Sequence, residues 1–397
     1  MLLLERLRLG VVVGALALSG CYLAHRTDPA LSVDAGTPDA SPSDASRPDA
    51  GHDAGFDAGG RACVGVELAE TVEIDDSEVG SVTPRLVALP GGELGLVHVR
   101  SDGSPSRIRY ERLSARLDRL HSTDATTTSW TWAQPVLRDG QPWIAHGGAG
   151  EPASLLQRLS PDGEPSGPAL TVPIFHPTIL RPTRGGFFWL TMTTRGDNAL
   201  LMVHLDTAGV PLYPTAEVAL GRYGSGHGAI AHPDGRSFVI TYPREGPRGV
   251  RNAYVNAINE DGELGPELPL SPMGDQSTVP LRQEDSLLVV SQGDGLVLDR
   301  RDFDTLELQE QFVFAPRGSR LLLAGVLAGR LIVAYRSGSA VRFEDFGEEL
   351  LEPGGPLGEV PSRGRGESIL VTTSAIYVAT IATSGHPFVA RLECVYE

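Results

Sequence analysis

A tight turn followed by a strongly apolar strand recurs along most of the chain. Glycine or aspartate marks the turn, as in Gly186 before Phe187–Leu190 and Asp285 before Leu287–Val290. Successive turns lie about 44 to 50 residues apart, a period typical of proteins built from repeated supersecondary units. The turns that mark the seven units are Gly92, Gly140, Gly186, Gly235, Asp285, Gly329 and Ser374.

Each unit is predicted to hold four strands. An opening strand such as 85–88 precedes the marker turn, and the apolar strand follows it. About 25 residues later, Asp162-Gly163 or Asp261-Gly262 separates the third strand from a weaker fourth. Asp-Gly supplies the positive φ that type I′ hairpin turns require. The continuously apolar middle strands indicate sheets that are covered on both faces, so the pattern favours an all-β fold.

The two ends of the repeat complement each other. The seventh unit stops after its third strand, 388–393, while the segment 66–72 before the first unit has the pattern of a fourth strand. Together they complete a seventh sheet. This pattern resembles the β-propeller superfold, which implies a seven-bladed β-propeller of four-stranded antiparallel blades, closed by an N-terminal strand that completes the last blade. The signatures of named propeller subfamilies are absent from the sequence.

The first 20 residues resemble a bacterial lipoprotein signal peptide. Arg6 and Arg8 precede the apolar run Leu9–Ser19, which is shorter than the roughly 20 residues of a membrane-spanning helix. Leu18-Ser19-Gly20-Cys21 resembles the lipobox of this family, which implies acylation of Cys21 after cleavage. Tyr22 after the cysteine favours the outer membrane. The alternative is an ordinary secretory signal with a chance cysteine.

Residues 21–60 are predicted to be a disordered tether. Asp-Ala recurs among Ser, Pro and Gly with almost no apolar bulk, so this segment cannot bury enough surface to offset the entropy of ordering. The remaining residues, 61–397, form the predicted propeller domain. Nothing preorganises the regular aspartates as calcium ligands, and a spacer is the better interpretation.

Cys63 and Cys394 are predicted to form a disulfide. Aligning the seventh unit with the third places both at the one blade where the chain lacks a hairpin. An exported location permits this bond, which would stabilise the fold by roughly 5–6 kcal/mol if loop-closure entropy alone acts. The alternative is a pair of buried free thiols.

Charge limits the classes of ligand. All 33 basic residues are Arg, and against 50 acids they leave a net charge of −17. Nucleic-acid binding is excluded because it needs a basic footprint. No His-x-x-x-His, Cys-x-x-Cys or Glu-x-x-His spacing indicates a metal site, and no cofactor is expected. Asp302 and Asp304 are a weak calcium signal that a hairpin turn explains better.

Candidate ligand-binding residues lie in or beside the loops that join second to third strands and one unit's fourth strand to the next unit's first. These loops share one face of a propeller and carry about as many arginines as acids. Tryptophans there offer stacking surfaces and arginines offer bidentate donors to an anionic or sugar-like ligand. The alternative is ordinary solvated turns. The candidates are Trp130, Trp132, His146, Arg195, His227, Arg244, Arg336 and Arg365.

These observations favour a lipid-anchored binding or scaffolding module of the cell envelope over an enzyme. A monomeric domain is expected, with an envelope protein or a glycan as partner. The alternative function is a glycan-active hydrolase or lyase, which would need clustered carboxylates with a proton donor. Loop acids are available for that role, namely Asp102, Glu151, Asp197, Glu245 and Asp294. Pure spacing of envelope components is a third possibility, and the sequence leaves the ligand open.

Overall fold

A computed structural model describes residues 63–74, 83–100, 106–128, 133–147, 154–172, 177–183, 185–192, 199–212, 216–219, 227–232, 237–245, 251–270, 277–283, 285–293, 295–327, 330–346, 353–361 and 367–396. The signal peptide, Cys21 and the tether lie outside these residues. Strands make up nearly all of the described chain, with one short 3-10 turn, Pro90–Gly92.

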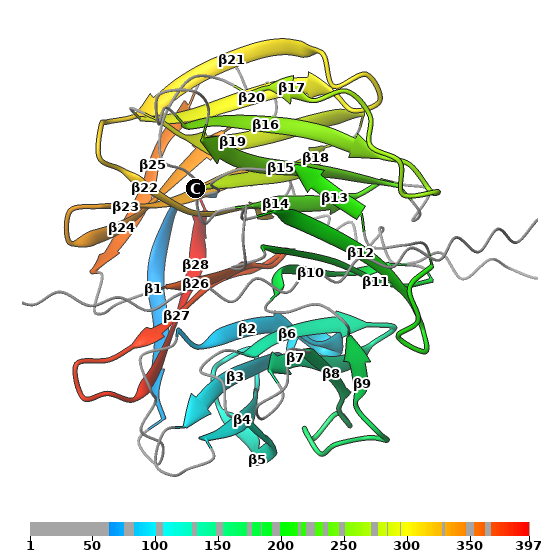
Figure 1. Ribbon diagram of the computed structural model, residues 1–397. Helices are drawn as coiled ribbons and strands as arrows, with labels where there is room; N and C mark the ends of the chain where they lie inside the picture. The colour runs from blue at the N-terminus through cyan, green and yellow to red at the C-terminus, as the bar shows by residue number, and fades with distance from the viewer. Residues whose placement is uncertain are drawn as a thin grey trace, which may run out of the picture. The chain divides into compact units, whose positions relative to one another are not determined.

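Seven four-stranded antiparallel sheets form the blades of a β-propeller (Figure 1). Blade 1 holds β2 (Arg85–Ala88), β3 (Leu94–Arg100), β4 (Ser106–Leu113) and β5 (Arg119–Thr128). Blade 2 holds β6 (Ala133–Arg138), β7 (Gln141–Gly147), β8 (Ser154–Arg158) and β9 (Leu170–Val172). Blade 3 holds β10 (Pro177–Thr183), β11 (Gly186–Met192), β12 (Leu200–Asp206) and β13 (Ala216–Ala219). Blade 4 holds β14 (Gly228–Ala231), β15 (Phe238–Glu245), β16 (Arg251–Ile258) and β17 (Leu268–Pro269).

The remaining three blades follow the same order. Blade 5 holds β18 (Thr278–Gln283), β19 (Ser286–Gln292), β20 (Leu296–Asp302) and β21 (Leu308–Ala315). Blade 6 holds β22 (Arg320–Leu327), β23 (Arg330–Ser337), β24 (Ala340–Phe346) and β25 (Pro353–Pro361). Blade 7 holds β26 (Ser368–Val371), β27 (Ala375–Ile381) and β28 (Pro387–Tyr396), with β1 (Cys63–Glu73) as its fourth strand.

The two ends of the repeat close the ring, as predicted. In blade 7 the strand order is β1-β28-β27-β26, so the blue first strand lies beside the red last strand in Figure 1. Val66 lies opposite Cys394 and Val72 lies opposite Val389. Cys63 and Cys394 form the predicted disulfide, with their Cα atoms 5.3 Å apart. The bond joins the strand that starts the described fold to the strand that ends it.

The core is divided among the blade interfaces. Seven hydrophobic clusters each join two neighbouring blades, and the cluster between blades 3 and 4 stacks Phe188 on Phe238 with ring centroids 4.1 Å apart. The middle strand β11 is buried on both faces, because Phe187, Phe188, Trp189 and Leu190 are all 0% exposed. Continuous apolar runs are therefore explained by contacts with two neighbours at once.

The first strands of the blades line the centre of the ring. β2 contacts β6 and β26, and the same kind of contact continues through β10, β14, β18 and β22. We call these seven strands the inner ring. Because each inner-ring strand touches its two counterparts, side chains on it lie between neighbouring blades or toward the axis.

One detail of the hairpins differs from expectation. Asp139 and Gly140 both have positive φ, 49° and 71°, as a type I′ turn requires. At Asp162-Gly163 and Asp261-Gly262 only the glycine has positive φ, 86° and 82°. There the amide of Gly163 donates to the Ser160 carbonyl and that of Ser160 to the Glu164 carbonyl, which makes a longer loop. The type I′ prediction was therefore wrong for these two turns, since the added residues let the aspartate keep an ordinary φ.

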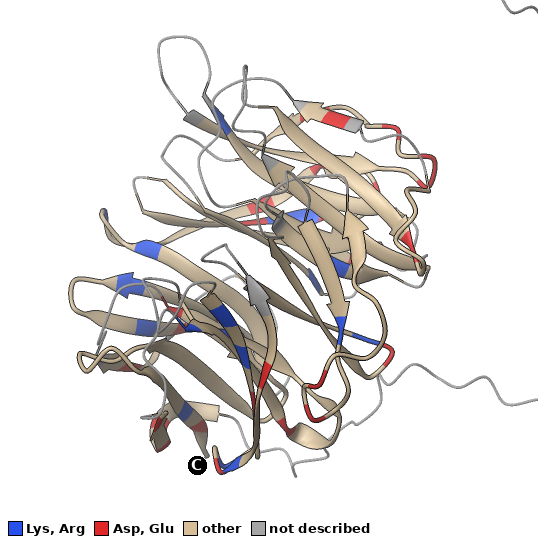
Figure 2. Ribbon diagram, turned by 60° about the horizontal axis from the view of Figure 1, so that its bottom comes forward, with Lys and Arg blue, Asp and Glu red and all other residues tan. Residues whose placement is uncertain are grey.

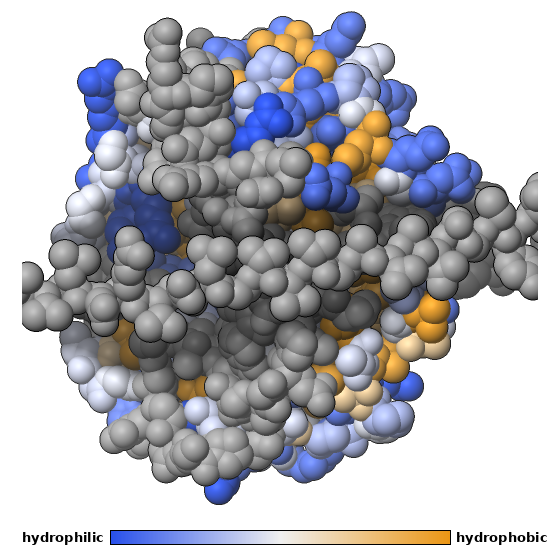
Figure 3. All heavy atoms as spheres, in the orientation of Figure 1, coloured by the Kyte–Doolittle hydropathy of each residue, from blue (hydrophilic) through white to orange (hydrophobic). Residues whose placement is uncertain are grey.

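Polar and charged side chains cover most of the described surface on the face drawn in Figure 3. Figure 3 shows hydrophobic atoms on this face only in small separate groups, and Figure 2 shows many of the acids in turns at the ends of strands. Among the described residues, no helix has the length and apolar character needed to cross a membrane.

Candidate functional site

Half of the predicted ligand-binding residues can be placed. Trp130, Trp132, Arg195 and Arg365 lie outside the described residues. The other four come from three blades, His146 from β7, His227 and Arg244 from blade 4, and Arg336 from β23. Each stands at the end of a strand or directly before one, next to a connecting loop.

Arg244 is held by its own blade. Its guanidinium lies 2.7 Å from a carboxylate oxygen of Glu267 and 4.7 Å from the ring centroid of Tyr254. Glu267 also accepts a 2.7 Å hydrogen bond from the Tyr242 hydroxyl. The guanidinium of Arg244 is therefore engaged by a carboxylate and an aromatic ring of its own blade.

Arg336 is also paired, across two blades. It forms an ion pair and hydrogen bond with Glu367, which directly precedes the first strand of blade 7. The Glu367 side chain is only 2% exposed, so Arg336 compensates a nearly buried charge. This contact explains the residue as a brace between blades 6 and 7.

The two histidines are buried and lie in different blades. His146 is 2% exposed, and its Nδ1 lies 3.2 Å from the Gly147 carbonyl oxygen. Burial lowers the pKa of His146, and it lowers the pKa of His227 to about 4. Both imidazoles are therefore neutral near pH 7 and present no positive charge to an anion.

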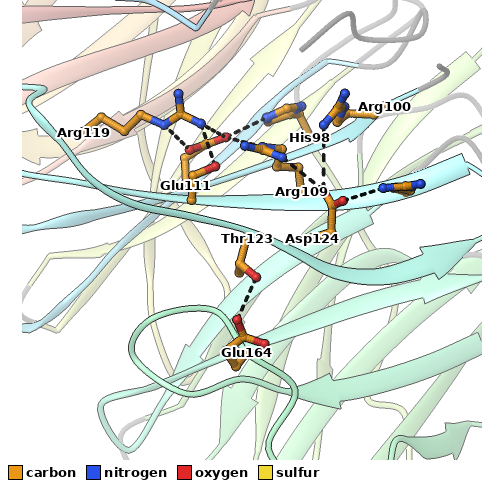
Figure 4. Close-up of polar contacts among 10 residues, drawn as sticks. His98, Arg100, Arg109, Glu111, Arg119, Thr123, Asp124 and Glu164 are labelled. Carbon is orange, nitrogen blue, oxygen red and sulfur yellow. Dashed lines mark hydrogen bonds and ion pairs between the residues drawn. The ribbon is translucent and has the colours of Figure 1, made fainter. Parts of the chain in front are cut away.

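The densest charged cluster of the described chain lies elsewhere, on blade 1 (Figure 4). Its centre is Glu111 on β4, whose side chain is 0% exposed. The Nε of Arg109 lies 2.9 Å and the Nε of Arg119 lies 2.8 Å from its carboxylate oxygens. His98 on β3 approaches the same carboxylate at 3.6 Å. A buried carboxylate thus has contacts from its own strand, β4, and from the two flanking strands, β3 and β5.

A second carboxylate extends this cluster outward. Asp124 on β5 lies 3.0 Å from Arg107 and 3.3 Å from Arg109, with Arg100 at 4.0 Å. Arg109 therefore bridges Asp124 and Glu111. Sequence reasoning missed the cluster, although charges at every second position of β4 (Arg107, Arg109 and Glu111) mark a polar face on a middle strand.

The cluster fixes the charge states of its members. Burial alone raises the pKa of Glu111, but its contacts with His98, Ser122 and Arg109 and the charge of Arg119 outweigh burial and hold the pKa below its ordinary value. Burial lowers the pKa of His98 despite the neighbouring carboxylate. Glu111 is therefore ionised and His98 neutral at pH 7.

This arrangement suits structural bracing better than acid catalysis. A general acid must carry its proton near the working pH, and Glu111 has the opposite shift. Its oxygens already accept from the two guanidinium groups. In the described parts of the chain, no group of three or more His, Cys, Asp or Glu is placed to hold a metal ion.

Comparison with known proteins shows a likeness of fold alone. No protein-family description and no curated protein matches the chain. The propeller of Dos1 superposes with a TM-score of 0.53 at 10% identity, covering 83% of this chain and 95% of that one. A prolyl endopeptidase structure covers 79% of this chain at 17% identity with a TM-score of 0.46. The present chain spans about half of that enzyme's length, 47%.

Proposed function

We propose that this protein is a lipid-anchored component of the bacterial cell envelope whose propeller acts as a binding or scaffolding module. The disulfide between Cys63 and Cys394 is the observation that carries the proposal. Structural disulfides persist in oxidising compartments outside the cytosol. The bond therefore supports export, in agreement with the lipobox-like sequence that ends at Cys21.

A binding role is favoured over catalysis because the charged side chains described above are paired with one another within the fold. Arg244, Arg336 and the arginines around Glu111 each neutralise an acid of the fold. The most deeply buried carboxylate of the blade 1 cluster is held ionised and does not act as a proton donor. A stable ring that presents loops to an envelope protein or a glycan agrees with these contacts.

The anchor is tested by expressing the full-length chain in a Gram-negative host fed an alkyne-bearing fatty acid. Wild-type protein should incorporate the label and sediment with outer-membrane vesicles. Cys21→Ser should lose both properties, because the residue that would carry the acyl chains is replaced. Cys63→Ser is the matched control and should keep the label. Equal labelling of wild type and Cys21→Ser would overturn the anchor.

The binding role is tested separately with the purified full-length protein in detergent on a glycan array and in pull-downs from envelope extracts. Saturable retention of one glycan class or one envelope protein supports the proposal. Turnover of an arrayed glycan, seen as release of its reducing end, would instead support a glycan-active enzyme.

A further inference from the structure

The inner ring differs in charge from the rest of the chain. Its seven strands carry Arg85, Arg138, Arg181, Arg282 and Arg320, and they contain no Asp or Glu. The whole chain has 50 acids against 33 arginines. Acids are thus missing from the one set of strands that surrounds the axis, while cations remain there.

The arginines are also the side chains through which the inner ring meets solvent. Of its described side chains, six are exposed, and four of these belong to arginines, namely Arg85, Arg181, Arg282 and Arg320, beside Pro182 and Val326. The other described positions are buried or half-buried between the blades. A ligand that entered the ring would therefore meet guanidinium groups first.

The side chain of Arg85, at the start of β2, has no hydrogen bond or ion pair with any described residue. Its side chain is exposed, yet burial lowers its pKa. The two observations agree if water touches the guanidinium directly while protein atoms fill much of the space further from it. Among the described residues, no acid lies beside this charge to neutralise it.

Arg181, on β10, is in a similar position. Its Nε donates a 3.1 Å hydrogen bond to the Ala229 carbonyl oxygen of β14, which orients the side chain across two inner-ring strands. A carbonyl does not neutralise the charge, and burial lowers the pKa of Arg181 as well. By contrast, Arg138 at the end of β6 lies 3.3 Å from Asp139 and over the ring of Phe187. Contacts within the described part of the chain therefore account for Arg138, but they place no acid against the charges of Arg85 and Arg181.

We propose that the inner ring binds an anion carrying a carboxylate or phosphate group, with Arg85 and Arg181 as its cationic donors. The planar guanidinium matches both groups, because each offers two oxygens to its paired N–H donors. The inner-ring strands contain no carboxylate that could compete with the anion for the guanidinium donors, and this strengthens the attraction between the anion and the arginines. This inference names the ligand chemistry of the proposed binding module and rests on that proposal only for its biological role.

The test is thermal unfolding and calorimetric titration of the purified full-length protein with inorganic phosphate and with citrate, in separate arms. Sodium chloride at equal ionic strength is the reference. Wild type should bind phosphate or citrate saturably and melt at a higher temperature in the anion that binds. The arm that gives the tighter binding distinguishes phosphate from carboxylate chemistry.

Arg85→Gln and Arg181→Gln should each weaken binding about tenfold or more, the effect expected for loss of a charged hydrogen-bond donor. In chloride alone, Arg85→Gln should melt at the same temperature as wild type or higher, since it removes a charge without an acid partner. This opposite sign separates loss of the site from loss of the fold. Arg342→Gln is the matched control, because it removes one positive charge from an exposed arginine on β24 and should leave anion binding unchanged.

Three outcomes would overturn the proposal: no saturable binding of either anion by wild type, equal binding by wild type and both inner-ring variants, or an equal loss in Arg342→Gln. None of them affects the fatty-acid labelling of Cys21, so failure of the anion site and failure of the membrane anchor are distinguishable.

Discussion

Blade 7 meets its two neighbours through very different contacts. Toward blade 6 it places the disulfide and an apolar layer in which Cys63 and Leu392 pack with Phe343. Toward blade 1 it places a second apolar layer, with Val389 against Leu94, and beyond it the charged cluster of Glu111. Leu94, Leu96 and His98 alternate on one face of β3, so the apolar layer and the cluster share that face.

This difference separates two ways of holding a ring closed. The disulfide lies on the side toward blade 6 and joins β1 to β28 within blade 7, while Arg330 of blade 6 donates a 3.1 Å hydrogen bond to the Cys63 carbonyl. On the side toward blade 1, apolar packing joins the two blades, and the charged cluster braces the strands of blade 1. Desolvation of these charges is costly unless each partner is present. The first side should be sensitive to reduction and the second to pH and to loss of a single charge.

The largest expected effect comes from the disulfide. Cys63→Ser with Cys394→Ser should lower the free energy of unfolding by at most roughly 5–6 kcal/mol, because the unfolded chain regains the entropy that the closed loop removes. Chemical denaturation of the purified protein measures the loss, and reduction of wild type should reproduce it. Non-reducing mass spectrometry should find the two cysteines linked in wild type. If both thiols alkylate freely in the native protein, the covalent side of the comparison fails.

A smaller effect is expected from the charged side. Glu111→Gln should lower the free energy of unfolding by about 3–5 kcal/mol, because Arg109 and Arg119 lose their buried counter-charge. Glu359→Gln is the control, since that carboxylate is 60% exposed opposite Arg342 and should change stability by less than about 1 kcal/mol. Urea denaturation at pH 7 checks both variants. Equal effects would mean that burial of Glu111 has no energetic consequence.

The Glu111 variant also has a pH signature. The folded-state pKa of Glu111 is lowered, so its stabilisation is present above the unfolded pKa and is lost as pH falls through the folded value. Below that value the wild type and Glu111→Gln should therefore converge in stability.

The smallest expected effect concerns a residue in neither interface of blade 7, so it separates the general acid sensitivity of the fold from that of the Glu111 cluster. His227 in blade 4 has a folded-state pKa of about 4 because of burial. In the unfolded chain this histidine has its ordinary pKa of about 6.5, so on acidification the unfolded state takes up the proton before the folded state does. The free energy of unfolding therefore falls as pH drops from about 6.5 toward 4, by about 2 kcal/mol at pH 5. His227→Gln should lack that part of the loss between pH 7 and pH 5 in urea denaturation. An unchanged pH slope would assign the mild-acid loss to other groups.

Local sequence patterns predicted the fold, because each blade consists of turns and strands that are close together in sequence. Gly186 with Phe187–Leu190 shows this, since the turn and the buried strand are adjacent. The closure of the ring was also predictable, because the last unit lacks a fourth strand after 388–393 and the segment 66–72 is an unassigned strand before the first unit. The charged cluster was not predictable, because Glu111 is explained only by His98 and Arg119, which lie on the flanking strands.

The candidate ligand face shows the same limit. Arg244 and Arg336 were predicted as donors from their positions in loops and strand ends, but each is paired with an acid distant in sequence. Glu267 directly precedes β17 of the same blade, and Glu367 directly precedes β26 of the next blade. The arginines of the inner ring are visible in the sequence one at a time. Only the contacts between first strands show that they surround a common axis without acids.

The register of blade 7 also determines how the domain carries mechanical load. Cys63 lies opposite Tyr396, and the disulfide beside them spans a sequence separation of 331 residues. A pull applied between an anchored N-terminal side and a partner held at the C-terminal strand would pass through this bond. The force path would bypass the other six blades, so the ring could bear tension without being stretched open, until the disulfide is reduced.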